Sequence, residues 1–276
     1  MKKLIAMALV LCMALVLVAC GKDEAKDTKP ATDPIITEPS TAPATEPSTE
    51  PSESTPAAPT EVMTYEQYAA AAEYDPLLIE AYVQATQSWW DDKISVYAQD
   101  ENGAYFIYNM ACSEEDAMKL VPGAKIRVTG YKAVFNGLNE IAAGATFEFV
   151  EAEPFIAESL DVTALMGTDE LVKHQGEKVS FKGATVVAKT NAAGEEAAFV
   201  YNWDGSGEAG GDCDLYFDAT INGQTYTFVI EYYLCNESSE AYQAVQNLKV
   251  GDVIDMEGFL YWYEGPQAHI TAVTVK

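Results

Sequence analysis

The sequence predicts an all-β protein, β-rich with short helices, in which two copies of one five-stranded domain follow each other. The first observation is an internal repeat: the stretch 120–137, LVPGAKIRVTGYKAVFNG, recurs as 248–265, LKVGDVIDMEGFLYWYEG. The second is the alternation of apolar and polar residues in short segments bounded by glycine, which is typical of strands. The third is an Asn-Gly pair in each half, at 102–103 and 222–223, which favours a hairpin turn. A repeat at fixed spacing indicates a duplicated unit.

The two copies of the repeat agree in register at a series of positions. These pairs are Leu120/Leu248, Gly123/Gly251, Ile126/Ile254, Gly130/Gly258, Tyr131/Phe259 and Gly137/Gly265. In each copy a helix-like segment, 113–119 or 237–246, precedes a turn glycine, an alternating strand and a second glycine. This order resembles the approach to strand four of an OB-fold, a five-stranded Greek-key barrel with a helix between strands three and four. The resemblance implies two tandem OB-fold-like barrels after a disordered linker.

The N-terminus has the form of a lipoprotein signal peptide. Two lysines precede an apolar run over 4–18, which is short for a membrane span. The run ends in Leu17-Val18-Ala19-Cys20, which resembles a bacterial lipobox, so we expect removal of residues 1–19 and lipidation of Cys20. The alternative is an uncleaved helix with an incidental cysteine. The lipobox predicts a protein anchored by lipid to the cell membrane, on its extracellular face.

Residues 20–62 join the lipidated cysteine to a linker of threonine, proline, serine and glutamate. Few apolar residues and regular prolines favour a disordered spacer. In a polyproline-like form such a spacer reaches at most about 120 Å, at roughly 3.1 Å for each residue. That length suits a domain held out through a cell wall, so a Gram-positive surface is favoured over a periplasm.

The chain is strongly acidic, with a formal net charge of −27 at pH 7. Removal of the predicted signal peptide leaves 14 basic and 43 acidic residues, and the part from residue 63 onward holds 11 and 34 of them. Such a field repels phosphate backbones and anionic lipid headgroups alike. The sequence therefore predicts no nucleic-acid partner and leaves membrane attachment to the lipid.

The first barrel is predicted over residues 63–150. Thr64 and Gln67 have the spacing of a capping box, which favours a short helix at its start. The expected strands are 77–86, 93–99, 104–109, 124–132 and 139–150.

A connector, 151–166, leads to the second barrel, which is predicted over 167–276. It begins with a short helix at 168–174 and repeats the plan of the first. The expected strands are 178–189, 213–221, 224–234, 252–261 and 266–275. The loop between its first two strands, 190–212, is longer and rich in glycine and acids.

OB-folds usually bind through the loops that join strands one to two and four to five. In both barrels these loops combine aromatic and acidic residues, so the resemblance places a ligand-binding surface there. The predicted contact residues are Trp89, Trp90, Phe135, Trp203, Trp262 and Tyr263. Aromatic rings beside acids can stack on a sugar, clamp a peptide or hold a cation. The alternative is that one tryptophan plugs a barrel end and the other packs on the neighbouring domain.

A calcium loop is the one metal site that the sequence suggests. Asn202, Asp204 and Ser206 fall at positions one, three and five of the pattern, with Gly207 at position six. Position twelve holds Cys213 in place of a bidentate glutamate. A glycine-rich acidic turn without an ion is therefore the main interpretation and calcium the alternative, and no other cofactor is predicted.

The sequence predicts no enzymatic activity. His174 and His269 have no nucleophile motif beside them, and neighbouring acids are expected from the composition. No glycine-rich phosphate loop follows a strand. Matched strand-end positions favour reduced, structural thiols over a disulfide or a zinc site for the cysteines of the folded part, which are Cys112, Cys213 and Cys235.

Over residues 4–276 this organisation resembles the uncharacterised tandem OB-fold surface lipoproteins of gut Firmicutes. The resemblance implies a lipid-anchored extracellular binding module without catalysis, with a glycan or an extracellular protein as its ligand. One alternative is a structural subunit of a cell-envelope complex, which would bury the tryptophans between the barrels. The other is a hydrolase that uses a pair of carboxylates.

Overall fold

The computed structural model describes residues 59–276. The predicted signal peptide, the lipidation site Cys20 and most of the predicted linker therefore lie outside the described residues. Within 59–276, no helix combines the length and the apolar character that crossing a membrane requires.

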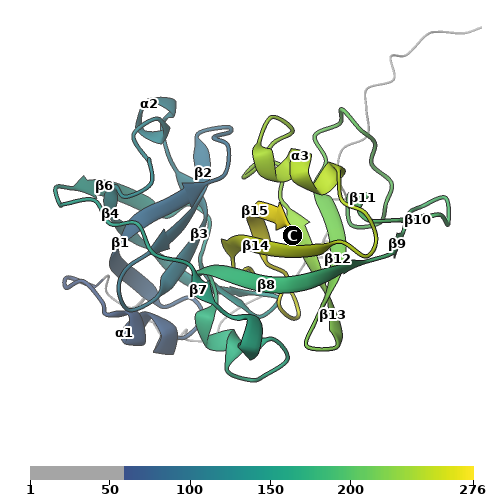
Figure 1. Ribbon diagram of the computed structural model, residues 1–276. Coiled ribbons are helices and arrows are strands. Elements are labelled where there is room, and N and C mark those ends of the chain that lie inside the picture. Colours follow the sequence, from purple (N-terminus) through teal and green to yellow (C-terminus); the bar gives the residue numbers. More distant parts are fainter. Residues whose placement is uncertain (1–58) are drawn as a thin grey trace, which may run out of the picture. The chain divides into compact units, whose positions relative to one another are not determined.

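The first barrel has the strand order of an OB-fold (Figure 1, blue to teal). Its strands are β1 (Pro76–Thr86), β2 (Lys93–Gln99), β3 (Ala104–Ala111), β4 (Lys125–Phe135), β5 (Leu138–Ile141) and β6 (Thr146–Val150). β3 pairs in parallel with β5, β5 pairs with β4, and the pairing of β4 with β1 closes the barrel. The segment predicted as strand five is divided into β5 and β6, which both pair with β4. The left-handed Gly144 (φ 84°) lies between them and interrupts the extended chain.

The second barrel repeats this topology (Figure 1, green to yellow). Its strands are β8 (Lys178–Val187), β12 (Leu215–Ile221), β13 (Gln224–Ile230), β14 (Val253–Phe259) and β15 (His269–Val275). β13 pairs in parallel with β15, and the pairing of β12 with β8 closes the barrel. Four short strands accompany it: β7 (Leu160–Asp161), β9 (Lys189–Thr190), β10 (Glu196–Ala197) and β11 (Val200–Tyr201). The predicted fold class, two tandem OB-fold barrels in a β-rich chain, is therefore confirmed.

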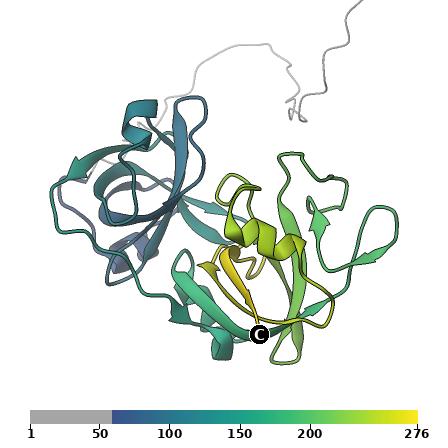
Figure 2. The ribbon, with the colours of Figure 1, turned by 45° about the horizontal axis from the view of Figure 1, so that its top comes forward.

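Two of the three α-helices fall where the OB-fold places a helix, and the third precedes the first barrel. α1 (Tyr65–Ala70) begins at the predicted capping box, in which the Gln67 amide donates to Thr64 Oγ1 and the Thr64 amide donates to Gln67 Oε1. α2 (Glu114–Ala117) and α3 (Glu240–Gln246) lie between strands three and four of their barrels. α3 packs buried residues against the second barrel, whereas the shorter α2 buries none. Figure 2 shows the yellow-green ribbon of α3 lying over the strands of the second barrel.

Two 3₁₀ helices, η1 (Thr163–Leu165) and η2 (Leu171–His174), precede the second barrel. The leading helix expected at 168–174 is therefore a 3₁₀ turn. Gly167 (φ 85°) and Gly176 (φ 79°) are both left-handed and bracket this segment, so the helical turns end at these glycines.

The duplication extends to single backbone hydrogen bonds. Gly123 and Gly251 have φ angles of 92° and 94°, a region that favours glycine. Each donates its amide to strand one of its own barrel, Gly123 to the Val83 carbonyl at 2.8 Å and Gly251 to the Val186 carbonyl at 2.9 Å. The glycines that define the repeat thus make the same turn into strand four in both copies.

The barrels have separate apolar cores and share a third cluster. Tyr97, Phe106 and Leu138 of the first barrel are buried against Phe259 of the second. Backbone hydrogen bonds flank this cluster, and the Ser88 amide donates to the Tyr233 carbonyl at 2.7 Å. This contact is the setting of the candidate site.

Candidate functional site

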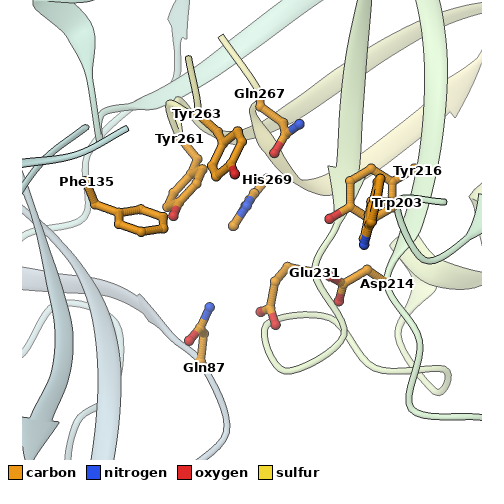
Figure 3. A pocket seen from close by; sticks show the side chains of 10 residues that line it. All are labelled: Gln87, Phe135, Trp203, Asp214, Tyr216, Glu231, Tyr261, Tyr263, Gln267 and His269. Atoms are coloured by element: carbon orange, nitrogen blue, oxygen red, sulfur yellow. The ribbon is translucent and has the colours of Figure 1, made fainter. Parts of the chain in front are cut away.

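A cavity of about 590 Å³ opens where loops of the two barrels meet. Figure 3 shows the side chains that line it: Gln87, Phe135, Trp203, Asp214, Tyr216, Glu231, Tyr261, Tyr263, Gln267 and His269. Gln87 follows β1 and Phe135 ends β4, so the first barrel contributes two of the ten residues and the second barrel the remainder. Five are phenylalanine, tyrosine or tryptophan, and none of these ten is lysine or arginine.

Strand register brings the two carboxylates of the cavity together. β12 and β13 pair with Leu215 opposite Ile230. Asp214 directly precedes the first of these residues and Glu231 directly follows the second, so they occupy adjacent ends of the same ladder. Figure 3 shows both carboxylates on one side of the cavity.

Glu231 is only 9% exposed and is incompletely hydrogen bonded. Its Oε1 accepts from the Tyr233 amide at 3.1 Å, whereas Oε2 is buried and has no hydrogen-bond partner among the described residues. Burial raises the pKa of this carboxyl to about 7, and the negative charge of Asp214 adds to the effect. The side chain of Gln87 lowers that pKa in part, without completing a hydrogen bond to Oε2.

Asp214 is better satisfied. Its Oδ1 accepts from the Tyr232 amide at 2.8 Å. Burial raises the pKa of Asp214, and that hydrogen bond opposes part of the increase. The acidic side of the cavity thus holds one anchored carboxylate and one with an oxygen free to accept.

The opposite side of the cavity is aromatic and uncharged. Phe135 and Tyr263 meet edge to face with their ring centres 6.0 Å apart, although they belong to different barrels. Tyr261 stacks on His269 at 4.2 Å. Burial lowers the pKa of His269 to about 3, so the imidazole is neutral at physiological pH. The arrangement can stack a flat or apolar ligand and accept a hydrogen bond from it.

Three of the six predicted contact residues line the cavity. Phe135, Trp203 and Tyr263 are exposed at 48%, 76% and 46%, as a role in ligand contact requires. A shared role for these three in ligand binding stays a prediction.

The other three lie elsewhere. Trp89 is half-buried, and its Nε1 donates to the Cys112 carbonyl at 2.8 Å. Trp90 is 66% exposed, with Lys93 Nζ 4.4 Å from the ring centre. The two adjacent tryptophans thus differ in exposure. Trp262 is half-buried and packs against the core of the second barrel and the shared cluster.

Sequence reasoning missed the acidic anchor of the cavity. Glu231 interrupts the apolar run Phe228-Val229-Ile230, and a charged residue that follows a buried strand without a break is a signal for a special environment. Its partner Asp214 lies far away in sequence, and only the hairpin register joins them.

The structure gives the calcium alternative no added support. The Oδ1 atom of Asp204 accepts from the Ser206 amide at 3.0 Å, which is an ordinary turn. Within the part of the chain that the structure describes, no group of three or more His, Cys, Asp or Glu residues is placed to hold a metal. The set Asn202, Asp204 and Ser206 remains a prediction.

The burial of the cysteines agrees with a structural role, and their reduced state stays a prediction. The three cysteines of the described residues are free and buried: Cys112, Cys213 and Cys235. Burial raises the pKa of Cys112 and of Cys235 to about 11, so both remain protonated thiols.

No known family model matches this sequence, and no curated protein matches it. Among solved structures it is similar to the Ifi202 HINa domain in complex with a 20-base-pair double-stranded DNA, with 12% identity, a TM-score of 0.32 and coverage of 74% of this chain and 96% of that one. It is also similar to a murine DNA-binding protein bound to double-stranded DNA (12% identity, TM-score 0.30, 73% and 97% covered). A third is a replication protein A heterotrimer bound to single-stranded DNA (10% identity, TM-score 0.31, 78% and 52% covered). At these identities the likeness is one of fold.

These neighbours correct the function expected from sequence. We expected a glycan- or protein-binding module and excluded nucleic acid because of the charge, whereas the similar solved structures hold DNA. Both expectations are withdrawn. What the neighbours bind remains a property of those proteins.

Proposed function

We propose that this protein binds a small organic molecule in the cavity between its barrels and releases it chemically unchanged. The observation that carries the proposal is the cavity itself, about 590 Å³ in volume, with aromatic walls and one buried carboxylate oxygen that lacks a partner. Small-molecule sites are typically concave, roughly 300–1,000 Å³ in volume, and mostly apolar with a few placed polar groups.

The hydrogen bonds beside the cavity support a preformed site. The Ser88 amide donates to Tyr233, and the Glu264 amide donates to Asn136 at 2.8 Å. Ser88 directly follows the lining residue Gln87, and Asn136 directly follows Phe135. These backbone hydrogen bonds hold the contributions of the first barrel next to those of the second, which reduces the entropy cost of binding.

We also propose that the protein acts at the extracellular face of a Gram-positive membrane, anchored through Cys20. The support is the lipobox and the linker in the sequence. Mass spectrometry of the N-terminal peptide tests this part, because a diacylated Cys20 is expected after cleavage. Cys20→Ser should abolish the modification and release the protein from the membrane. Membrane retention of that variant after removal of residues 1–19 would contradict the anchor.

The binding proposal is tested by a small-molecule screen on the mature chain carrying Cys20→Ser, with ligand-observed NMR as the readout. Phe135→Ala and Tyr263→Ala each remove an aromatic ring from the cavity wall and should lower the affinity for bound compounds at least tenfold. Trp90→Ala is the control, because that aromatic ring is also exposed but lies outside the cavity. Equal effects of the three variants would contradict the assignment.

Nucleic acid is included in the same screen because the similar structures hold DNA. An oligothymidylate and a free nucleoside separate two modes of binding. An oligonucleotide that binds with a strong salt dependence, while the nucleoside does not, would overturn the small-molecule site. Conversion of a bound compound into product would overturn the non-catalytic part of the proposal.

A further inference from the structure

We propose that the ligand of this cavity is a protonated primary amine on an aromatic or apolar body, with its ammonium group held between Asp214 and Glu231. This inference rests on the proposed small-molecule site and names the chemical class that the site accepts. It depends on three properties of the cavity: an unpaired acceptor, an excess of negative charge and aromatic walls.

The unpaired acceptor is Oε2 of Glu231, which is buried and completes no hydrogen bond among the described residues, although the Gln87 side chain is close enough to lower the pKa of the carboxyl. A buried acceptor without a hydrogen bond costs free energy in the empty protein, and a ligand N–H group removes that cost. The adjacent Asp214 keeps one oxygen on the Tyr232 amide and has lone pairs left for a second donor. A primary ammonium carries three N–H donors, enough to reach both carboxylates.

The negative charge of the two carboxylates has no counter-ion among residues 59–276. Neither Asp214 nor Glu231 takes part in any salt bridge of the described residues. His269, the one basic side chain of the lining, is neutral at physiological pH. Burial raises the pKa of Tyr216 to about 12, so this phenol is neutral as well. A cationic ligand supplies the missing charge.

A metal ion fits these residues less well than an amine. Calcium requires at least six oxygen ligands and zinc usually four protein ligands. The cavity offers two carboxylates, and no group of three metal-binding side chains exists among residues 59–276.

The walls select an apolar or aromatic body. Phe135 and Tyr263 stand at the junction of the two barrels, and Tyr261 presents a ring backed by His269. Trp203 is 76% exposed although it lines the cavity, so its ring is available to cover a ligand. Ring faces also attract an ammonium group when it is desolvated.

The test is isothermal titration calorimetry on the Cys20→Ser mature chain at pH 8 with three matched probes: 2-phenylethylamine, 2-phenylethanol and the N,N,N-trimethyl derivative of the amine. The amine is expected to bind at least tenfold more tightly than the alcohol, which lacks the charge. The amine should also bind more tightly than the trimethyl compound, which keeps the charge and cannot donate a hydrogen bond. An alcohol that binds as tightly as the amine would overturn the inference.

Two substitutions test the anchor. Glu231→Gln and Asp214→Asn should each lower the affinity for the amine at least tenfold and leave the affinity for the alcohol unchanged. Glu208→Gln removes an exposed acid of the loop that leads to Asp214, and it should alter the affinity for neither the amine nor the alcohol. If Glu231→Gln leaves amine binding intact, the ammonium position is wrong. If only neutral compounds bind and Phe135→Ala lowers their affinity, the assignment of an amine ligand is wrong but the small-molecule site is supported. If Phe135→Ala changes the affinity of no compound, the small-molecule site itself is wrong.

Discussion

Tyr97 Oη lies 2.7 Å from Nδ1 of His269, in a buried contact that joins β2 of the first barrel to β15 of the second. The same imidazole stacks on Tyr261, which lines the cavity. One side chain therefore belongs both to the contact between the barrels and to the wall of the candidate site. Any change that displaces His269 should alter both.

The first prediction concerns the acid sensitivity that His269 confers. Burial lowers its pKa from 6.5 to about 3, so the stability that depends on the neutral ring is complete above pH 6.5 and is lost as pH falls towards 3. His269→Asn keeps a polar atom near Nδ1 and cannot titrate. Between pH 7 and pH 4 the wild type should lose roughly 2–3 kcal/mol more unfolding free energy than this variant. Urea denaturation at both pH values measures it, and equal losses would show that His269 does not titrate on unfolding.

The second prediction concerns Glu231, whose pKa is raised by folding, whereas that of His269 is lowered. Burial raises it from 4.5 to about 7, so the favourable contribution is complete below pH 4.5 and is lost as pH rises through 7. Without ligand, Glu231→Gln should therefore be more stable than the wild type at pH 8, by roughly 1–3 kcal/mol. The difference should vanish at pH 4.

Thermal unfolding across this pH range provides the measurement. Glu208→Gln, at an exposed position of the same barrel, should follow the wild type throughout. A wild type that is more stable than Glu231→Gln at pH 8 would mean that Oε2 has a partner in solution.

The third prediction concerns Lys132, a lysine in the interior of the first barrel. It is 1% exposed, and its Nζ donates to the Tyr68 carbonyl at 3.3 Å and lies 3.7 Å from the Tyr68 ring centre. Burial lowers its pKa from 10.5 to about 8, so its unfavourable contribution is complete below pH 8 and declines as pH rises towards 10.5. Lys132→Met should stabilise the protein at pH 7 by roughly 1–3 kcal/mol.

The same substitution should have a smaller effect at pH 10, where the folded protein holds Lys132 neutral. Lys173→Met is the control, because Lys173 is exposed and its effect should be small at both pH values. Chemical denaturation at pH 7 and pH 10 decides the matter. Destabilisation by Lys132→Met would show that the contact with the Tyr68 ring outweighs the cost of burial.

The two barrels could be predicted from the sequence, whereas the candidate site could not, and the reason is physical. Turns and strands depend on neighbours in the chain: Gly123 and Gly251 need a left-handed backbone wherever the barrels lie, and the Asn222-Gly223 pair makes the hairpin turn with positive φ at both residues. The acidic anchor depends on the register that places Glu231 beside Asp214. The cavity depends further on the contact between barrels, which local periodicity does not encode.

The repeat also hides a difference between its two copies. Tyr131 and Phe259 occupy the same repeat position, yet Tyr131 is 51% exposed and Phe259 is 3% exposed. Phe259 stacks on Tyr97 with ring centres 4.4 Å apart and planes at 14°. The duplicated position has thus become part of the contact between the barrels in one copy and part of the surface in the other.

The fourth prediction uses this pair as its own control. Phe259→Ala leaves a cavity in the shared cluster and should cost about 3–5 kcal/mol, the range for buried aromatic truncation. Tyr131→Ala removes an exposed ring and should stay within about 0.5 kcal/mol. Urea denaturation compares the two. Phe259 stacks on Tyr97, which contacts His269 in the cavity wall. Phe259→Ala should therefore also lower the affinity of the cavity for its ligands in the absence of urea. Tyr131→Ala should leave that affinity unchanged. Equal stability costs would mean that the barrels do not rely on this contact in solution.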